Sequence, residues 1–189
     1  MKKYIFIAAG LLTLTGTVNA QKKKSIVKFN SMNSIGFLTG QTQSIFTIQS
    51  INGIKYKTWF AGLGASMDRY GYQSIPVFAD IRKSFGNKAW HPFVYADAGI
   101  NYPIYSALLP RKESGNDAYR FRHTFYGETG VGLEKAISTK TTFMFSAGFS
   151  YKHFSYLQYG VQNPIYQNSS ATLFDFFYRR LSIKTGVVL

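Results

Sequence analysis

Residues 141–154 read T-T-F-M-F-S-A-G-F-S-Y-K-H-F. Every second residue from Phe143 to Tyr151 is apolar or aromatic, and the residues between them are mostly small or polar. This period of two is typical of a β-strand, because successive side chains of a strand point to opposite sides. A helical period of 3.6 residues would scatter the same rings around the helix axis. The stretch therefore predicts a strand with one apolar face and one polar face.

The same alternation recurs along the chain and gives eight candidate strands. They lie near residues 31–41, 43–51, 57–69, 72–85, 92–105, 120–134, 141–154 and 173–189. Asn52 and Gly53 predict a turn after the second strand. Pro76 has no N–H to donate, so we expect an irregularity in the fourth strand. An even number of amphipathic strands predicts an all-β protein, an eight-stranded antiparallel up-and-down transmembrane β-barrel formed by residues 31–189.

The N-terminus has the parts of a secretory signal peptide. Lys2 and Lys3 precede a short apolar run, and Val18-Asn19-Ala20 resembles a small-x-small cleavage site. We therefore expect residues 1–20 to be a signal peptide and residues 21–30 to be a short basic periplasmic segment. Such a leader predicts export to the outer membrane of a Gram-negative envelope.

Composition narrows the chemistry that this chain can perform. The absence of cysteine excludes disulfides, thiolate metal sites, a cysteine nucleophile and a lipoprotein anchor. His91 and His123 lack the spacing of a zinc site, so we expect neither metal nor cofactor. A formal net charge of +14 indicates an anionic partner. For an exported protein that partner is outer-membrane lipid or lipopolysaccharide rather than nucleic acid.

The lengths of the connections predict which end of the barrel faces outward. Small barrels have short periplasmic turns and longer external loops. Residues 106–119 and 155–172 form the two long connections, whereas residues 136–140 form a short one. The two tryptophans and seven of the tyrosines also separate to opposite strand ends, as two aromatic belts would. We therefore expect 106–119 and 155–172 to be external loops that contact lipid, lipopolysaccharide, or a surface protein or glycan of unknown identity.

Several charged residues occupy the alternate strand positions that we expect to face the inside of the barrel. A soluble protein would place apolar residues in its interior. The charged residues are Asp80, Arg82, Asp97, Arg122, Glu128, Lys152 and Lys184. An eight-stranded barrel encloses room for side chains only, and a buried ion without a partner costs several kcal/mol. We therefore predict a network of ion pairs that fills the lumen. The alternative is that these charges hold a cation or a small polar ligand.

Five segments carry a resemblance to a known family. They are G-L-G-A-S-M-D-R-Y at 62–70, S-I-P-V-F-A-D-I-R at 74–82, P-F-V-Y-A-D-A-G at 92–99, F-Y-G-E-T-G-V-G at 125–132 and R-L-S-I-K-T-G at 180–186. The chain thereby resembles the bacterial outer membrane protein β-barrel domain family, which includes small eight-stranded, porin-like barrels. The likeness covers most of residues 57–189. It implies an envelope protein without assigned activity and carries over no catalytic residue.

Two functions follow. The first is a non-enzymatic outer-membrane barrel that acts through its external loops. Four cations near the external rim are expected to bind lipid phosphates. These are Arg111, Lys112, Arg120 and Arg122.

The alternative function is a lipid A acyl-ester hydrolase. His153 and Ser155 resemble the H-x-S arrangement of the outer-membrane lipid A deacylases, in which a lipid-facing His activates a Ser. A third group should orient the His. The residue about a dozen positions beyond Ser155 is Gln167 rather than an acid, and the nearest downstream carboxylate is Asp175.

Overall fold

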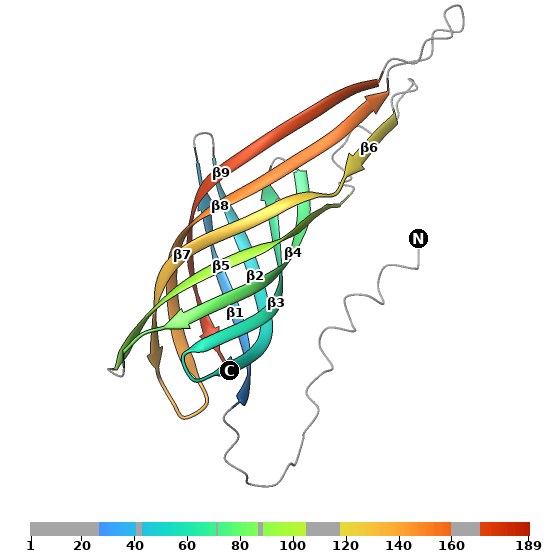
Figure 1. Ribbon diagram of the computed structural model, residues 1–189. Coiled ribbons are helices and arrows are strands. Elements are labelled where there is room, and N and C mark those ends of the chain that lie inside the picture. Colours follow the sequence, from blue (N-terminus) through green and yellow to red (C-terminus); the bar gives the residue numbers. More distant parts are fainter. Residues whose placement is uncertain (1–26, 41–42, 71, 87–88, 105–117, 160–170) are drawn as a thin grey trace, which may run out of the picture.

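The computed structural model describes residues 27–40, 43–70, 72–86, 89–104, 118–159 and 171–189. It contains nine strands in chain order (Figure 1). They are β1 (Val27–Thr39), β2 (Ser44–Tyr56), β3 (Trp59–Tyr70), β4 (Tyr72–Ser84), β5 (Trp90–Pro103), β6 (Ala118–Arg122), β7 (Thr124–Ala136), β8 (Thr142–Tyr159) and β9 (Ala171–Val188). In this part of the chain no helix is long and apolar enough to cross a membrane.

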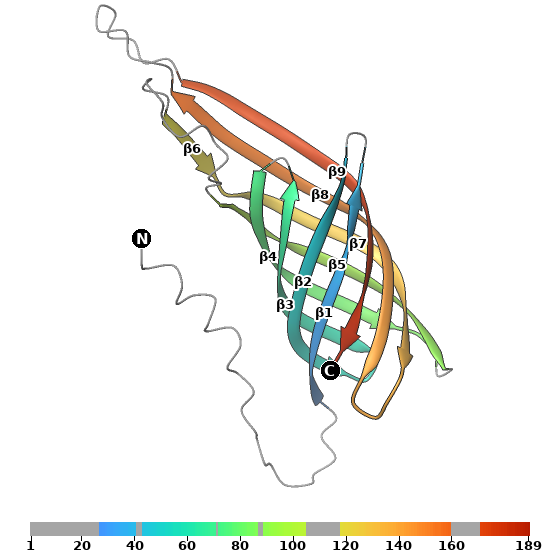
Figure 2. The same ribbon diagram turned by 180° about the vertical axis from the view of Figure 1, so that it is seen from behind.

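The strands form one closed antiparallel barrel. From β1 to β5 each strand pairs with the next, β5 pairs with β7, and β7 to β9 again pair in order. β9 pairs back onto β1 from Met32↔Val188 to Thr39↔Leu181. β6 and β7 both pair with β8, one above the other, and together occupy one position in the wall. Figures 1 and 2 show the closed wall from opposite sides. The eight-stranded up-and-down barrel is therefore confirmed.

A β-bulge at His123 separates β6 from β7. Arg122 pairs with Ser155 and Tyr126 pairs with Lys152, so this strand advances four residues while β8 advances three. The extra residue exchanges the two faces of the strand. As a result Arg122 lies exposed on the outer face. The prediction that Arg122 belongs to the lumen network was wrong, because aromatic residues on both parities around His123 hide this change of face in the sequence.

Two strand boundaries also differ from those predicted. Asn52 and Gly53 do not form a turn but pair with β3 inside β2. The chain reverses instead at Lys57, which has a φ of 55°. At the other end of the barrel β8 runs to Tyr159, so Ser155 lies within a strand rather than in a loop.

Other predictions were confirmed or fall outside the described residues. Pro76 lacks a partner on β3, where the ladder passes from Ala65↔Val77 to Asp68↔Ser74. The signal peptide 1–20, most of segment 21–30 and most of the loops 106–119 and 155–172 lie outside the described residues. The short connections β2–β3, β4–β5 and β7–β8 lie at one end of the barrel, the turn end. The connections β5–β6 and β8–β9 leave from the other end, the loop end (Figure 1).

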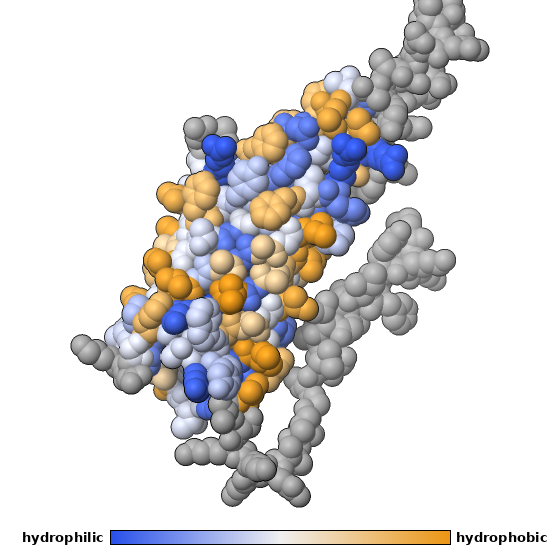
Figure 3. All heavy atoms as spheres, in the orientation of Figure 1, coloured by the Kyte–Doolittle hydropathy of each residue, from blue (hydrophilic) through white to orange (hydrophobic). Residues whose placement is uncertain are grey.

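The outer face is apolar, as the alternation of β8 predicts. Phe145 and Phe149 are 44% and 46% exposed, and Leu133 on β7 is 42% exposed. Figure 3 shows such apolar side chains over the surface of the wall. Exposed rings along a closed barrel are stable in hydrocarbon and unfavourable in water. The outer face therefore fits a lipid environment.

The lumen is filled by side chains, and part of that filling is apolar. One buried cluster comprises Met32, Ile51, Phe60, Phe78, Phe93, Tyr95, Tyr126, Met144 and Val188. Two glycines make room for its rings. A Cβ at Gly132 would collide with the ring of Phe93, and one at Gly148 would collide with the hydroxyl of Tyr95. The interior is therefore a mixed core, with rings packed beside the polar groups that the sequence predicts.

Candidate functional site: polar clusters on the two faces of the wall

Three carboxylates form a row across the lumen. Asp80 on β4 pairs with Asp97 on β5, which in turn pairs with Glu128 on β7. All three are buried, and a cation serves each end of the row. Arg82 Nη2 lies 2.9 Å from Asp80 Oδ2, and Lys184 Nζ lies 2.7 Å from Glu128 Oε1. The row and these two cations make up the lumen cluster.

Glu128 is the most heavily hydrogen-bonded member of the lumen cluster. Its Oε1 accepts from the Tyr95 hydroxyl at 2.7 Å and from Ser182 Oγ at 2.9 Å. Its Oε2 accepts from the Tyr126 hydroxyl at 3.0 Å. With Lys184, four donors satisfy one buried carboxylate, and each such bond matters more in a low dielectric. Glu128 therefore ties together side chains from β5, β7 and β9.

Asp97 differs from its two neighbours in the row. It makes no salt bridge within the described part of the chain. Its Oδ2 accepts a long hydrogen bond of 3.4 Å from Gln49 Nε2, and its buried Oδ1 has no hydrogen-bond partner among the residues that the structure describes. The prediction that each inward charge pairs with an opposite charge was therefore wrong for Asp97.

Lys152 finds a partner that the predicted network did not include. Its Nζ contacts Asp68 Oδ1 and donates to Ser74 Oγ at 2.8 Å. Asp68 has the inward parity of β3, so its face was predictable although its partner was not. Glu134, another inward acid, lies 3.6 Å from Lys55. The lumen thus contains ion pairs beyond those predicted from the sequence. Their residues lie on the strand face that was predicted to point inward.

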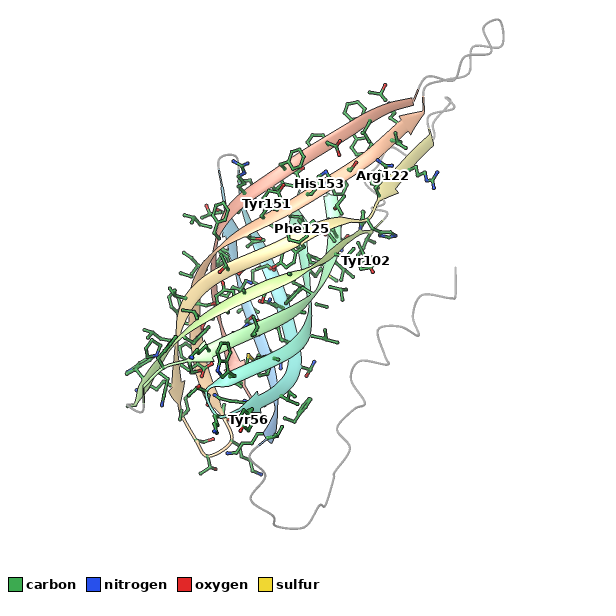
Figure 4. All side chains as sticks on the ribbon, in the orientation of Figure 1. Tyr56, Tyr102, Arg122, Phe125, Tyr151 and His153 are labelled. Atoms are coloured by element: carbon green, nitrogen blue, oxygen red, sulfur yellow. The ribbon has the colours of Figure 1, made fainter. Side chains whose placement is uncertain are left out.

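A second polar cluster lies on the outer face of the same strands. His153 and Ser155 share the outward side of β8, and Ser155 pairs directly with Asp175 on β9. On its other side Ser155 pairs with Arg122 on β6. Figure 4 shows Arg122 and His153 close together near the loop end, with Tyr56 at the opposite end of the barrel. We call His153, Ser155, Asp175 and Arg122 the outer cluster.

The histidine of the outer cluster is held on two sides. His153 Nε2 lies 3.0 Å from Asp175 Oδ1. The His153 ring stacks on Phe177 with a centroid distance of 4.6 Å and an interplanar angle of 10°. A carboxylate on one ring nitrogen fixes the tautomer and leaves the other nitrogen able to accept a proton. Asp175 therefore occupies Nε2, and Nδ1 is the ring nitrogen left for a further partner.

Ser155 is buried, with 2% of its surface exposed, although it points outward. Its Oγ interacts with the Asp175 carboxylate but makes no hydrogen bond of good geometry. A hydroxyl beside an imidazole and a carboxylate is the set of groups used in nucleophilic acyl transfer. The sequence supplied the His and the Ser. The acid, Asp175, comes from the register between β8 and β9, and Gln167 lies outside the described residues.

The four cations expected to bind lipid phosphates are only partly described. Arg120 and Arg122 are exposed on the outer side of β6. Arg111 and Lys112 lie outside the described residues. Among the residues that the structure covers, no cluster of three or more His, Asp or Glu side chains is arranged to hold a metal ion.

Comparison with known proteins supports the architecture. No model of a known protein family matches the sequence, and no curated protein matches it significantly. The structure is similar to the crystal structure of Neisserial surface protein A (NspA), with a TM-score of 0.53 and 12% sequence identity. The match covers 87% of this chain and 97% of that one. The translocator domain of the autotransporter NalP from Neisseria meningitidis is a weaker match, with a TM-score of 0.21, 14% identity and 89% coverage of both chains. A TM-score this low does not indicate a shared fold. The chain is therefore a small eight-stranded barrel of the outer-membrane type.

Proposed function

We propose that this protein resides in the bacterial outer membrane and acts without catalysis, as a module that binds lipopolysaccharide at the external surface. The observation that carries the proposal is a ribbon formed by β6, β8 and β9, which projects beyond the other strands at the loop end (Figure 1). β8 and β9 have 18 residues each, whereas β1 to β5 have 12 to 14. Because about 9–11 tilted residues cross the hydrocarbon core, several residues of each long strand extend beyond it.

The two faces of the ribbon have different chemistry. Its inner face carries stacked rings, with Tyr156 and Phe174 at 5.0 Å and Phe176 and Tyr178 at 6.2 Å between centroids. These rings stiffen the ribbon where it leaves the barrel. Its outer face carries exposed Arg120, Arg122 and Arg179.

Guanidinium groups on this outer face suit the phosphates of lipopolysaccharide. Arg binds phosphate through a rigid fork of donors, and the attraction is strongest where the surroundings are partly desolvated. Arg120 and Arg122 are two residues apart on one face of a strand, so both can reach one headgroup. This supports lipopolysaccharide as the partner rather than nucleic acid. Arg111 and Lys112 add to this set in the proposal.

The test is binding of purified lipopolysaccharide to the refolded protein. Arg120→Gln with Arg122→Gln should weaken binding about 25-fold, since a cation near an anionic lipid surface contributes about 1 kcal/mol. Lys140→Gln is the matched control, because it removes a charge at the turn end. Equal loss in the control, or no loss in the Arg variants, would disprove recognition by the ribbon. Fractionation with the inner membrane would disprove the location itself.

A second function is favoured by one specific observation, the contact between His153 and Asp175 beside Ser155. In this proposal Asp175 orients His153, and His153 accepts the proton of Ser155 as its oxygen attacks an acyl ester of lipid A. An acyl-enzyme forms as the alcohol leaves, and water then releases the fatty acid. The outer cluster faces the lipid, where acyl chains join headgroups. Arg122 would hold the phosphate of the substrate.

Mass spectrometry of lipid A distinguishes the two functions. Expression of a hydrolase lowers the mass of lipid A by one acyl chain, and Ser155→Ala, His153→Ala and Asp175→Asn each abolish the change. Lys140→Gln should leave it intact. An unchanged lipid A profile together with lipopolysaccharide binding that depends on Arg120 and Arg122 would leave the non-catalytic function alone.

A further inference from the structure

The outer face has an apolar groove near the turn end, far from the outer cluster. The groove has a volume of about 340 Å³ and crosses β5, β7 and β8. It is lined by Phe85, Pro92, Phe93, Val94, Val131, Gly132, Leu133, Phe145 and Ala147. Phe93 and Gly132 have the inward parity of their strands, and the other seven residues are apolar residues of the outer face. We call this feature the turn-end groove.

The register explains why a groove forms at this place. One row across the wall runs from Pro92 to Leu133 to Phe145, and the next row runs from Val94 to Val131 to Ala147. The first row is bulky and the second is small. The step between the two rows accounts for the hollow.

Two lysines stand at the margin of the turn-end groove. Lys83 pairs with Val94 in the row of small residues, and its Nζ lies 4.5 Å from the ring centroid of Trp59 and 5.8 Å from that of Phe85. Lys135 pairs with Trp90, and its Nζ lies 5.1 Å from that ring centroid. Tryptophan and lysine in this arrangement mark the level of lipid headgroups.

The two charged groups at the margin of the turn-end groove, Lys83 and Lys135, are both positive. In the described part of the chain no carboxylate is paired with either ammonium group, so both can interact with a phosphate. The apolar groove is complementary to an acyl chain of an anionic glycerophospholipid, and the two lysines are complementary to its phosphate.

We propose that the turn-end groove binds an anionic glycerophospholipid of the periplasmic leaflet. One acyl chain lies in the groove, and the headgroup lies at its margin, where Lys83 and Lys135 stand. This inference rests on the proposed placement of the barrel in the outer membrane, with the turn end toward the periplasm. It does not depend on lipopolysaccharide binding or on catalysis at the loop end.

Native mass spectrometry of the full chain, refolded and released from detergent, tests the site. The probes are phosphatidylglycerol, cardiolipin and phosphatidylethanolamine at equal concentration. The wild-type protein should retain the two anionic lipids in preference to phosphatidylethanolamine. Lys83→Gln and Lys135→Gln should each reduce that retention about fivefold, because each cation near a lipid surface contributes about 1 kcal/mol.

Two controls separate a specific site from general attraction. Lys140→Gln removes a charge at the same end of the barrel but off the groove, and should leave retention unchanged. Ala147→Phe fills the groove without altering charge and should lower retention, whereas Ala61→Phe on the outer side of β3 should not. Stronger retention of cardiolipin than of phosphatidylglycerol would identify a ligand with two phosphates.

The outcomes that overturn the proposal are equally defined. Equal retention of all three lipids by a protein that runs as a folded, heat-modifiable band would eliminate the site but leave the barrel and its location intact. A loss in Lys140→Gln as large as that in Lys83→Gln would show unspecific attraction. Failure of the wild-type chain to fold into lipid would remove the membrane placement, and this site with it.

Discussion

The lumen cluster and the outer cluster lie on opposite faces of the same wall, yet they are built differently. In the lumen Glu128 is buried and has four hydrogen-bond donors around it. On the outside Asp175 and His153 form one contact at 3.0 Å, with 38% and 27% of their side-chain surfaces exposed. Burial makes the first cluster part of the core. The second contributes little to folding.

This difference indicates which polar groups are structural. A charge inside a narrow barrel is costly unless it is paired, so the ion pairs of the lumen are explained by packing. The His, Ser and acid of the outer cluster have no such explanation, because they lie on the outer face of the wall, where His153 and Asp175 are partly exposed. The outer cluster is therefore the better place to look for a function. Substitutions in the two clusters should separate the two roles.

The largest effect is expected for Glu128→Leu. The change leaves Lys184 as a buried charge without its partner and removes the acceptor of three hydroxyl groups. We expect a loss of at least about 5 kcal/mol in the free energy of unfolding, the upper end for a broken buried pair. Urea unfolding in lipid vesicles measures it. Glu134→Leu in the same strand is the control and should cost less, because its partner Lys55 is 31% exposed.

A smaller contrast is expected within the lumen row. Asp80→Asn weakens the ion pair with Arg82 and should cost about 3–5 kcal/mol. Asp97→Asn removes a charge that faces Asp80 and has no salt bridge in the described residues, so it should change stability by less than about 1 kcal/mol. Unfolding of both variants under the same conditions tests this. Equal destabilisation would mean that Asp97 has a cationic partner in solution.

Substitutions in the outer cluster should leave stability nearly unchanged. His153→Ala removes a partly exposed contact, which is worth about 0–1 kcal/mol. Ser155→Ala removes a hydroxyl without a well-formed hydrogen bond. The urea midpoint of both should match the wild type even if lipid A processing is lost. A large drop in the midpoint would show that this cluster, like the lumen cluster, is structural.

The smallest perturbation tests the bulge at His123, which puts Arg122 in the outer cluster. Because the chain has no cysteine, single cysteines can be placed at chosen positions without background. Arg122→Cys should react with a water-soluble maleimide, and Phe121→Cys should be protected, since Phe121 packs on the ring of Phe154. Little change in stability is expected. The reverse pattern would place Arg122 in the lumen.

Much of the barrel follows from sequence parity, and its failures have physical causes. Alternation within β8 correctly placed Phe145 outward and Lys152 inward. It could not place Arg122, because aromatic residues occupy both parities around His123 and conceal the extra residue. The β2 boundary was missed because Asn52 and Gly53, a common turn pair, lie inside a strand here. The alternation along a strand therefore predicts which side chains share a face, but it does not predict bulges or strand ends.

The candidate sites depend on register, which no single segment contains. His153 and Ser155 lie on one face by simple counting. Asp175 joins them only because β8 and β9 pair at that offset. The Lys152–Asp68 contact joins residues 84 positions apart. Such partners are set by barrel closure, so the sequence indicates which groups share a face but not which of them meet.

The pairing of β1 with β9 has a consequence for biogenesis. They are the first and last strands of the barrel in chain order, and their ladder runs from Met32↔Val188 to Thr39↔Leu181. Until β9 has been translated, β1 keeps a row of free amide and carbonyl groups, which is a template for intermolecular aggregation. Loops of this length also make closure slow. We therefore expect a newly made chain to expose this unpaired edge until its first and last strands pair.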